Sequence, residues 1–298
     1  MKRFCTILIL FSFILTTPVW AWWGGGHDIL TQAAVKSLPD EVPEFFRNAD
    51  KMVAHCSYDP DISKERSTPN ARQSEYGEHY IDIEYFGEHP IPDGREAHIQ
   101  LCAELGLTPR EVGTLPYALA EWTERLALAF AEYRKWPDNP MIRSKCFLYA
   151  GFLAHYAQDM CQPLHLTIHF DGIKQEDGTR LHRGIHEKVD SSIELLGLDP
   201  MELAKAQQIE AVADLMPAII EQIKTGHSLV DNVYELADDW QDLKNPTPDL
   251  TDFVNGRARE SVRWTASLCL TAWKLSENIK LPGWLDRAQI DAHASHTH

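Results

Sequence analysis

Apolar residues recur at helical spacing along most of this chain. Between Leu115 and Lys135, for example, Trp122, Leu126 and Phe130 follow one another at intervals of four residues and therefore share one face of a helix. Alternating patterns typical of strands are few, and turn sequences such as Pro137-Asp-Asn-Pro140 separate the helical segments. The pattern predicts an all-α fold with helices over Asp28–Ser37, Leu115–Lys135, Met141–Met160, Gly184–Leu196, Gln207–Thr225, Ser228–Leu243 and Leu250–Glu277.

These helices are expected to form one domain. The chain has 298 residues, of which 44% are hydrophobic, and this is enough to bury a sizeable core. No linker-like change in composition and no internal repeat divides it. We therefore expect a single multi-helix domain over residues 22–285 and a flexible tail over residues 286–298. The segments Gly87–Arg95 and Lys174–Arg183 are expected to be loops, which either border a cleft or simply connect elements.

The first residues have the composition of a secretory signal peptide. Lys2-Arg3 precedes the apolar run Ile7–Leu15, and the small-residue sequence Val19-Trp-Ala21 follows it. We expect cleavage after Ala21, which would remove residues 1–21 and make the protein secreted or periplasmic. The run is shorter than the roughly 20 residues that a membrane-spanning helix needs, and no later stretch qualifies, so we expect no stable membrane insertion.

Imidazoles and carboxylates lie at metal-ligand spacing in the second half of the chain. In both His155-x-x-x-Asp159 and His186-x-x-x-Asp190, the two side chains share one face of a helix and can converge on one ion. Pro163 is expected to end the first of these helices, which leaves His165 just beyond the break and free to point at a different ion. Two pairs and a further histidine at a helix break indicate a site for several metal ions; the alternative is a set of scattered structural histidines.

Cleavage after Ala21 would create one more ligand. The mature chain would begin Trp22-Trp-Gly-Gly-Gly-His27. A free amino group has an ordinary pKa of about 7.7–8.0, so it can lose its proton at modest cost and chelate a metal together with its own carbonyl oxygen. The three glycines allow the backbone to fold tightly enough for His27 to join it, and a flexible terminus is the alternative.

In this order along the chain, these residues resemble the superfamily of secreted zinc-dependent phospholipases C and single-strand-specific nucleases. The family pattern has an N-terminal tryptophan, an early histidine, an aspartate before a His-aromatic segment, the block that runs here from His155 to His165, and a later His-x-x-x-Asp. The match runs from Trp22 to about Leu196. The resemblance implies an all-α domain built around a cluster of three zinc ions.

The resemblance also implies which residues hold each zinc ion. Asp61 is preferred to Asp59 as a ligand because Pro60-Asp61-Ile-Ser-Lys64 is similar to the family's Asp-x-x-basic pattern, and Asp59 stays open as the alternative. The three implied sets are Trp22 (amino nitrogen and carbonyl oxygen), His27 and Asp159; Asp61, His79, His155 and the bridging Asp159; and His165, His186 and Asp190.

Such a cluster is suited to the hydrolysis of phosphodiesters. Zinc lowers the pKa of bound water from 15.7 toward about 7, so two ions bridged by Asp159 could share a hydroxide while the third ion takes up charge on the leaving oxygen. Lys64 or Arg66 would stabilise negative charge on the phosphoryl oxygens, although the family usually has arginine where Lys64 stands. The resemblance places Tyr80 and Asp82 beside the substrate pocket, and an ordinary half-buried segment is the alternative for them.

Charge bears on the choice of substrate. The formal net charge is −16, and loss of the cationic pair Lys2-Arg3 would make it −18, which lowers the expected affinity for nucleic acid and for anionic membranes without excluding either. A spacing of five residues from Trp22 to His27 resembles the nuclease branch, so a nuclease or nucleotidase that acts on single-stranded nucleic acid or nucleotides is our first hypothesis. A phospholipase C that holds a choline-type head group with Tyr76, Tyr80 and Glu78 is the alternative, and a secreted structural zinc protein is the non-enzymatic one. No protein partner is predicted.

Five cysteines would remain after cleavage. Secretion permits disulfides, but an odd number leaves at least one thiol unpaired. Cys161 could in principle bind zinc, although a small buried residue or a disulfide partner is the better expectation. The histidines near the C-terminus are expected to lie in the flexible tail. The five cysteines are Cys56, Cys102, Cys146, Cys161 and Cys269.

Overall fold

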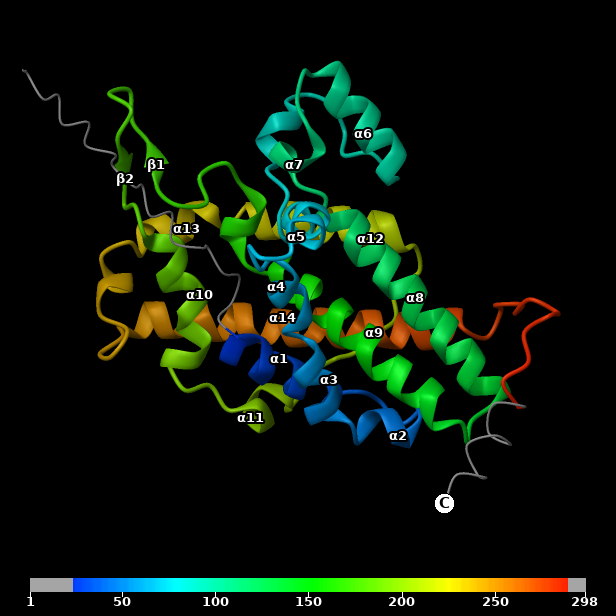
Figure 1. The fold of residues 1–298 in the computed structure, drawn as a ribbon. Coiled ribbons are helices and arrows are strands. Elements are labelled where there is room, and N and C mark those ends of the chain that lie inside the picture. Colours follow the sequence, from blue (N-terminus) through cyan, green and yellow to red (C-terminus); the bar gives the residue numbers. More distant parts are fainter. Residues whose placement is uncertain (1–23, 289–298) are drawn as a thin grey trace, which may run out of the picture.

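The structure, a computed structural model, describes residues 24–288 and is all-α (Figure 1). In this part of the chain the only sheet is one two-stranded hairpin, formed by β1 (Ile173–Lys174) and β2 (Arg180–Leu181), with Ile173 opposite Leu181. The all-α prediction is therefore confirmed. The expected signal peptide, Trp22 and most of the expected tail lie outside the described residues.

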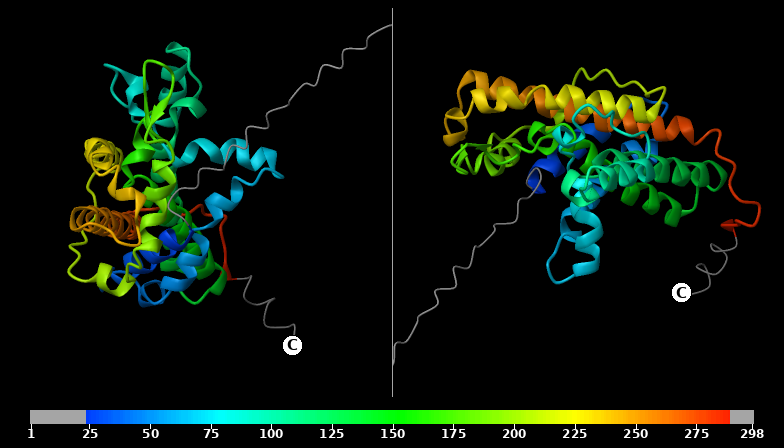
Figure 2. Two further views of the ribbon diagram at one scale, coloured as in Figure 1. Left: turned by 90° about the vertical axis from the view of Figure 1, so that its left-hand side faces the viewer. Right: turned by 90° about the horizontal axis from the view of Figure 1, so that it is seen from above.

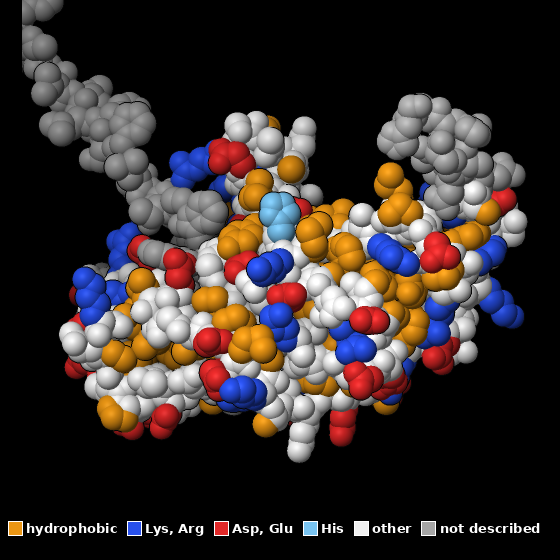
Figure 3. All heavy atoms as spheres, turned by 90° about the horizontal axis from the view of Figure 1, so that it is seen from below, with side chains coloured by type: hydrophobic (Ala, Val, Ile, Leu, Met, Phe, Trp, Pro, Cys, Tyr) orange, Lys and Arg blue, Asp and Glu red, His pale blue; other side chains and the backbone are white. Residues whose placement is uncertain are grey.

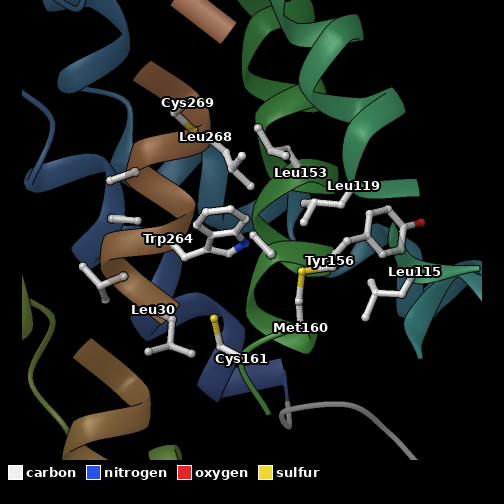
Figure 4. Close-up of a cluster of buried hydrophobic side chains, with 14 of the residues drawn as sticks. Leu30, Leu115, Leu119, Leu153, Tyr156, Met160, Cys161, Trp264, Leu268 and Cys269 are labelled. Carbon is white, nitrogen blue, oxygen red and sulfur yellow. The ribbon is translucent and has the colours of Figure 1, made fainter. Parts of the chain in front are cut away.

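Four helices form the centre of the molecule. They are α1 (Gly24–Lys36), α8 (Leu115–Lys135), α9 (Pro140–Asp159) and α14 (Pro248–Leu275), and they pack against one another (Figure 1). Their facing sides share one apolar core, in which Leu30, Leu119, Leu153 and Leu268 surround Trp264 (Figure 4). The apolar positions that predicted the helices are thus the positions that hold them together.

Side-chain caps begin two of the central helices at the turn sequences. The Asn139 side chain accepts from the amide of Met141 at the start of α9, and the Thr247 hydroxyl accepts from the amide of Leu250 at the start of α14. A proline occupies the first helical position in both, where a missing N–H costs nothing.

The predicted helices agree with the structure where tertiary contacts do not override the local pattern. The bounds of α8 match the prediction, and those of α9, α14 and α10 (Ile185–Leu195) differ from it by one or two residues. The prediction for residues 207–225 is wrong in its first half, because α12 (Leu215–His227) starts late and the preceding segment lies on α14, where the Val212 amide donates to the Thr271 hydroxyl at 3.0 Å.

The predicted helix over residues 228–243 is interrupted. It divides into α13 (Val230–Glu235) and the 3-10 helix η4 (Asp239–Gln241). Trp240 turns its ring into the core and donates its indole N–H to the carbonyl of Val233 at 3.0 Å. Burying this large side chain outweighs the continuation of a regular helix.

Short helices make up most of the remaining structure, and the apolar pattern did not predict them. They are too brief to show a helical period, and many begin with proline at the first turn. They are α2 (Glu44–Arg47), α3 (Asp50–Cys56), α4 (Asp59–Ser63), α5 (Pro69–Glu75), α6 (Arg95–Glu104), α7 (Pro109–Val112) and α11 (Pro200–Ala204), with the 3-10 helices η1 (Tyr76–His79), η2 (Ile83–Phe86) and η3 (Pro163–Leu166).

The outer shape and the surface charge of the molecule are both uneven. The α4–α5 segment projects from the body of the molecule (Figure 2). Figure 3 shows one face on which acidic and basic side chains alternate, without a large region of one sign. None of the described helices is long and apolar enough to cross a membrane.

Close packing of α3 on α9 brings α4 toward the end of α9. Gly151 makes this approach possible, since a Cβ at this position would lie 2.4 Å from the Cβ of Cys56 and 2.6 Å from its carbonyl carbon. Backbone cannot move aside as a flexible side chain can. The glycine therefore fixes the distance between the two helices.

We expect Gly151→Ala to lower the free energy of unfolding by about 1–3 kcal/mol, because the added methyl group forces α3 away from α9. Gly256→Ala is the matched control: Gly256 is also inside a helix, but a Cβ there meets nothing within 4 Å. The control should gain about 0.5–1 kcal/mol from helix propensity. Denaturant unfolding of both variants measures the difference, and equal effects would contradict the close-packing argument.

Candidate metal centre

Residues far apart in the sequence meet beside the end of α9. All of them are buried, with at most 6% of each residue exposed. They fall into three adjoining groups, and within each group the ligand atoms lie within 4.8 Å of one another. The groups are His27, His155 and Asp159; Asp61, His79 and His155; and His165, His186 and Asp190.

The first two groups share the end of α9. Asp159 Oδ2 lies 3.0 Å from His79 Nδ1 and 3.3 Å from His155 Nε2, while Asp159 Oδ1 lies 3.6 Å from His27 Nε2. Asp61 Oδ1, on α4, lies 3.9 Å from His79 Nδ1. One carboxylate thus faces both groups, which is the position expected of the bridging Asp159.

The third group lies on η3 and α10. His165 Nε2 is 3.2 Å from His186 Nε2, and His186 Nε2 is 3.0 Å from Asp190 Oδ2. As expected from the sequence, Pro163 follows the end of α9 and begins a separate short helix that carries His165. His165 Nδ1 is 3.7 Å from Asp159 Oδ1, so this group adjoins the other two.

Hydrogen bonds to carbonyl oxygens fix the tautomer of several histidines. Nδ1 of His155 lies 2.8 Å from the Ser57 carbonyl, and Nδ1 of His165 lies 2.8 Å from the His79 carbonyl. A carbonyl can only accept, so Nδ1 must carry the proton and Nε2 presents a lone pair to the group. Nδ1 of His186 likewise lies 3.2 Å from the carbonyl of Phe170. Metal-binding histidines are commonly oriented by this kind of partner.

Three supporting residues were not assigned a role from the sequence. Gln158 accepts from His27 Nδ1 at 2.6 Å, and Gln162 donates to Asp190 Oδ1 at 2.8 Å. Glu75 lies 3.4 Å from His79 Nε2 without a hydrogen bond between them, and its carboxylate accepts from the Tyr156 hydroxyl. Both glutamines lie within or beside the His155–His165 block, but the spacing does not reveal which partner each one binds.

Burial controls the protonation of the metal-free cluster. Burial and the neighbouring His155 lower the pKa of His27 to about 4, and burial lowers the pKa of His155 to about 4 as well. Burial raises the pKa of Asp159 well above its usual range. The His27 and His155 imidazoles are therefore neutral and able to bind a cation, whereas the Asp159 carboxylate needs a nearby positive charge to remain ionised.

Unsatisfied polar atoms show that the residues fit a metal ion. His27 Nε2 and Asp159 Oδ1 are buried and have no hydrogen-bond partner, although they face each other at 3.6 Å. An unpaired buried polar group costs about 1–3 kcal/mol. Imidazole nitrogen and carboxylate oxygen are zinc ligands, and a bound cation would satisfy both atoms.

The structure also separates the alternatives left open by the sequence. Asp61 belongs to one of the groups and Asp59 does not, although both lie on α4. The sulfur of Cys161 accepts from Gln222 at 3.5 Å, outside the three groups, and burial raises its pKa to about 12. All five cysteines among the described residues are free thiols.

A pocket of about 250 Å³ opens onto the cluster. Lys64, Tyr80 and Asp82 are among its lining residues, and the Lys64 ammonium lies 2.6 Å from Asp61 Oδ1. Arg66, the alternative to Lys64, is not among the lining residues. The other lining residues are Tyr76, His79, Tyr85, Glu111, Leu164, His165, Phe170 and His186.

The suggested role of Glu78 in holding a choline-type head group is wrong. Its two carboxylate oxygens accept from the guanidinium of Arg95 at 2.8 and 2.9 Å, and one of them also accepts from the Thr114 hydroxyl. Glu78 does not line the pocket. It ties η1 to α6 instead.

Glu84 joins three segments around the third group. Its carboxylate accepts from the Thr167 hydroxyl, from the Ile168 amide at 3.1 Å and from His227 Nε2 at 2.9 Å. Burial alone would raise the pKa of Glu84, but the hydrogen bonds from His227 and Thr167 outweigh it and lower the pKa to about 2. This carboxylate thereby anchors the chain that follows His165.

Comparisons with known proteins leave the family resemblance resting on the motifs. No family model matches the chain, and no curated protein matches it. One similar solved structure is the alpha toxin from Clostridium absonum, at 14% identity and a TM-score of 0.42, with 88% of this chain and 65% of the toxin chain covered. Nothing in these comparisons supports a nuclease.

We expect Asp159→Asn to lose the metal of the first two groups together, because its carboxylate faces both. His186→Ala should disturb only the third group. Zinc content per protein, measured by atomic emission after dialysis, tests this, with Asp59→Asn as the control that keeps full content. Equal losses in Asp159→Asn and His186→Ala would contradict the bridging position.

We expect Glu84→Gln to lower the free energy of unfolding of the metal-free protein by about 1–3 kcal/mol at pH 7. The pKa of Glu84 is lowered from 4.5 to about 2. Its ionised form therefore stabilises the fold above about pH 4.5, and this contribution is lost as the pH falls through about 2. Denaturant titrations should show the penalty shrinking by about half between pH 7 and pH 3. Exposed Glu88, as Glu88→Gln, is the control, and a pH-independent penalty would contradict the assignment.

Proposed function

We propose that this protein is a secreted zinc-dependent hydrolase of phosphodiesters. The proposal rests on three adjoining His/Asp groups, two of which contribute histidines to the lining of a pocket that Lys64 also lines. Zinc ions held by these groups would lower the pKa of water and offset negative charge on a phosphate. Three ions, with Trp22 completing the first set through its amino group, are part of the proposal.

The side chains of the chain itself have distinct tasks in this scheme. Asp159 and Asp61 supply the negative charge that holds the cations, and the carbonyl-bound histidines keep their lone pairs directed at them. Lys64, on the pocket wall, places a point charge where phosphoryl oxygens would lie. Tyr80 and Asp82 border the space for the group esterified to the phosphate.

Access to the cluster favours catalysis over a structural role. Structural zinc sites are closed by their protein ligands, whereas catalytic sites keep an open position. His79, His165 and His186 all line the pocket, so a small molecule can reach the groups from solvent. We therefore favour an enzyme over the structural zinc protein.

For the substrate, we propose a phospholipid head group in place of the nuclease hypothesis. A pocket of about 250 Å³ has room for one phosphate and one attached group. The chain has 44 acidic and 28 basic residues, which disfavours binding of an extended polyanion. The reaction would be that of a phospholipase C, which releases the phosphorylated head group.

The test uses zinc-loaded protein that begins at Trp22. We expect hydrolysis of bis(p-nitrophenyl) phosphate, release of phosphorylated head groups from phospholipid vesicles, and little release of acid-soluble nucleotides from single-stranded DNA. Asp159→Asn should lower kcat/KM by more than about 100-fold, and Asp59→Asn should not. Efficient cleavage of DNA alone would restore the nuclease hypothesis, and a fully loaded protein that hydrolyses none of the three would support the structural role.

A further inference from the structure

Three arginines lie against aromatic rings that line the pocket. The guanidinium groups of Arg72 and Arg110 lie against the ring of Tyr76, with Cζ at 5.2 and 4.6 Å from its centroid. Arg180 lies over Phe170 at 5.5 Å. Tyr76 and Phe170 both line the pocket, so each of these rings separates it from, or carries beside it, a cation that is not itself a lining residue.

These arginines come from separate parts of the fold. Arg72 is on α5, Arg110 is on α7 and Arg180 is on β2, and Figure 1 shows the hairpin on one side of the α5 and α7 region. The gathering is therefore a product of the tertiary structure. Charge counted along the sequence does not show it, because each segment also carries acidic residues.

Within residues 24–288, none of these three guanidinium groups forms an ion pair. Arg95, by contrast, is bound by both Glu78 and Glu121. Arg72 donates to the Lys64 carbonyl at 2.5 Å, which holds the side chain in place and leaves other N–H groups free to donate. Arg180 likewise donates to a carbonyl, that of Gly172, at 3.0 Å, so the bonds that hold Arg72 and Arg180 do not neutralise their charge.

The carboxylates that line the pocket do not offset this charge equally. Glu111 accepts from the amide and the hydroxyl of Thr108 at 2.8 Å each, in a capping box that begins α7. It is therefore committed to its own helix. Asp82, the other carboxylate in the pocket lining, is buried.

We infer that Arg72 and Arg110, held against Tyr76, bind a second anionic group of the substrate. Guanidinium groups bind phosphate through paired hydrogen bonds, and an aromatic platform fixes their planes. The inference rests on the proposed function and specifies its substrate class: a phosphodiester whose head group carries an additional phosphate. A phosphorylated cyclitol head group of a phospholipid has this chemistry, and so does a nucleotide with a neighbouring phosphate.

Two pairs of soluble substrates test the inference. The first pair is the p-nitrophenyl phosphodiester of inositol with and without a further ring phosphate. The second is the p-nitrophenyl ester of thymidine 5′-phosphate with and without a 3′-phosphate. We expect kcat/KM to be at least about 10-fold higher for the phosphorylated member of the inositol pair.

The variants Arg72→Gln and Arg110→Gln should each lower this preference by about 10-fold. Arg125→Gln is the matched control, because Arg125 lies over Trp122 at 4.9 Å in the same kind of contact but away from the pocket. It should leave the preference unchanged. Zinc content and melting temperature confirm that each variant is folded and loaded.

The outcomes separate the inference from the proposed function. Hydrolysis of bis(p-nitrophenyl) phosphate without a preference in either pair would overturn the inference and leave the phosphodiesterase in place. A preference in the thymidine pair alone would support the second anion site and overturn the lipid source. A preference that survives both Arg72→Gln and Arg110→Gln would overturn the assigned residues. A zinc-loaded protein that hydrolyses nothing would overturn both proposals.

Discussion

The burial of imidazoles and carboxylates in direct contact is the constraint on which this structure depends. Transfer of an ionised carboxylate from water into a protein interior is costly unless an opposite charge accompanies it. Burial raises the pKa of Asp159 and lowers that of His155, so both are driven toward neutrality when no cation is present. Bound cations would offset the cost of burying the ionised Asp159 carboxylate. Metal binding would therefore stabilise the folded protein.

The helical framework holds this costly arrangement in place through backbone contacts. Gly151 lets α3 approach α9, and this brings the Ser57 carbonyl within 2.8 Å of His155. Across the cluster, Glu84 ties the chain after His165 to α12, and Gln162 holds Asp190 on α10. The catalytic chemistry we propose therefore depends on contacts that also stabilise the fold, so substitutions at these positions will change stability and metal content together.

Sequence patterns predicted the long helices and most of the cluster, but not the contacts between distant segments. The spacing of His155 and Asp159 places them on one helix face from local geometry alone. Other contacts depend on tertiary packing, which no local spacing encodes. They are the contact of Glu75 with His79, the ion pair of Glu78 with Arg95 and the contact of Arg110 with Tyr76. The prediction of a helix over residues 207–214 failed because a tertiary contact holds this segment along α14, and the local pattern does not reveal that contact.

We regard the three buried groups as zinc sites, and Asp159 as a ligand shared by the first two. Anomalous diffraction at the zinc edge from crystals of the protein beginning at Trp22 tests it most directly. We expect three peaks, each at about 2.0–2.3 Å from imidazole or carboxylate atoms of its group, with Asp159 in contact with two of them. A single peak, or ions bound away from Asp159, would contradict it.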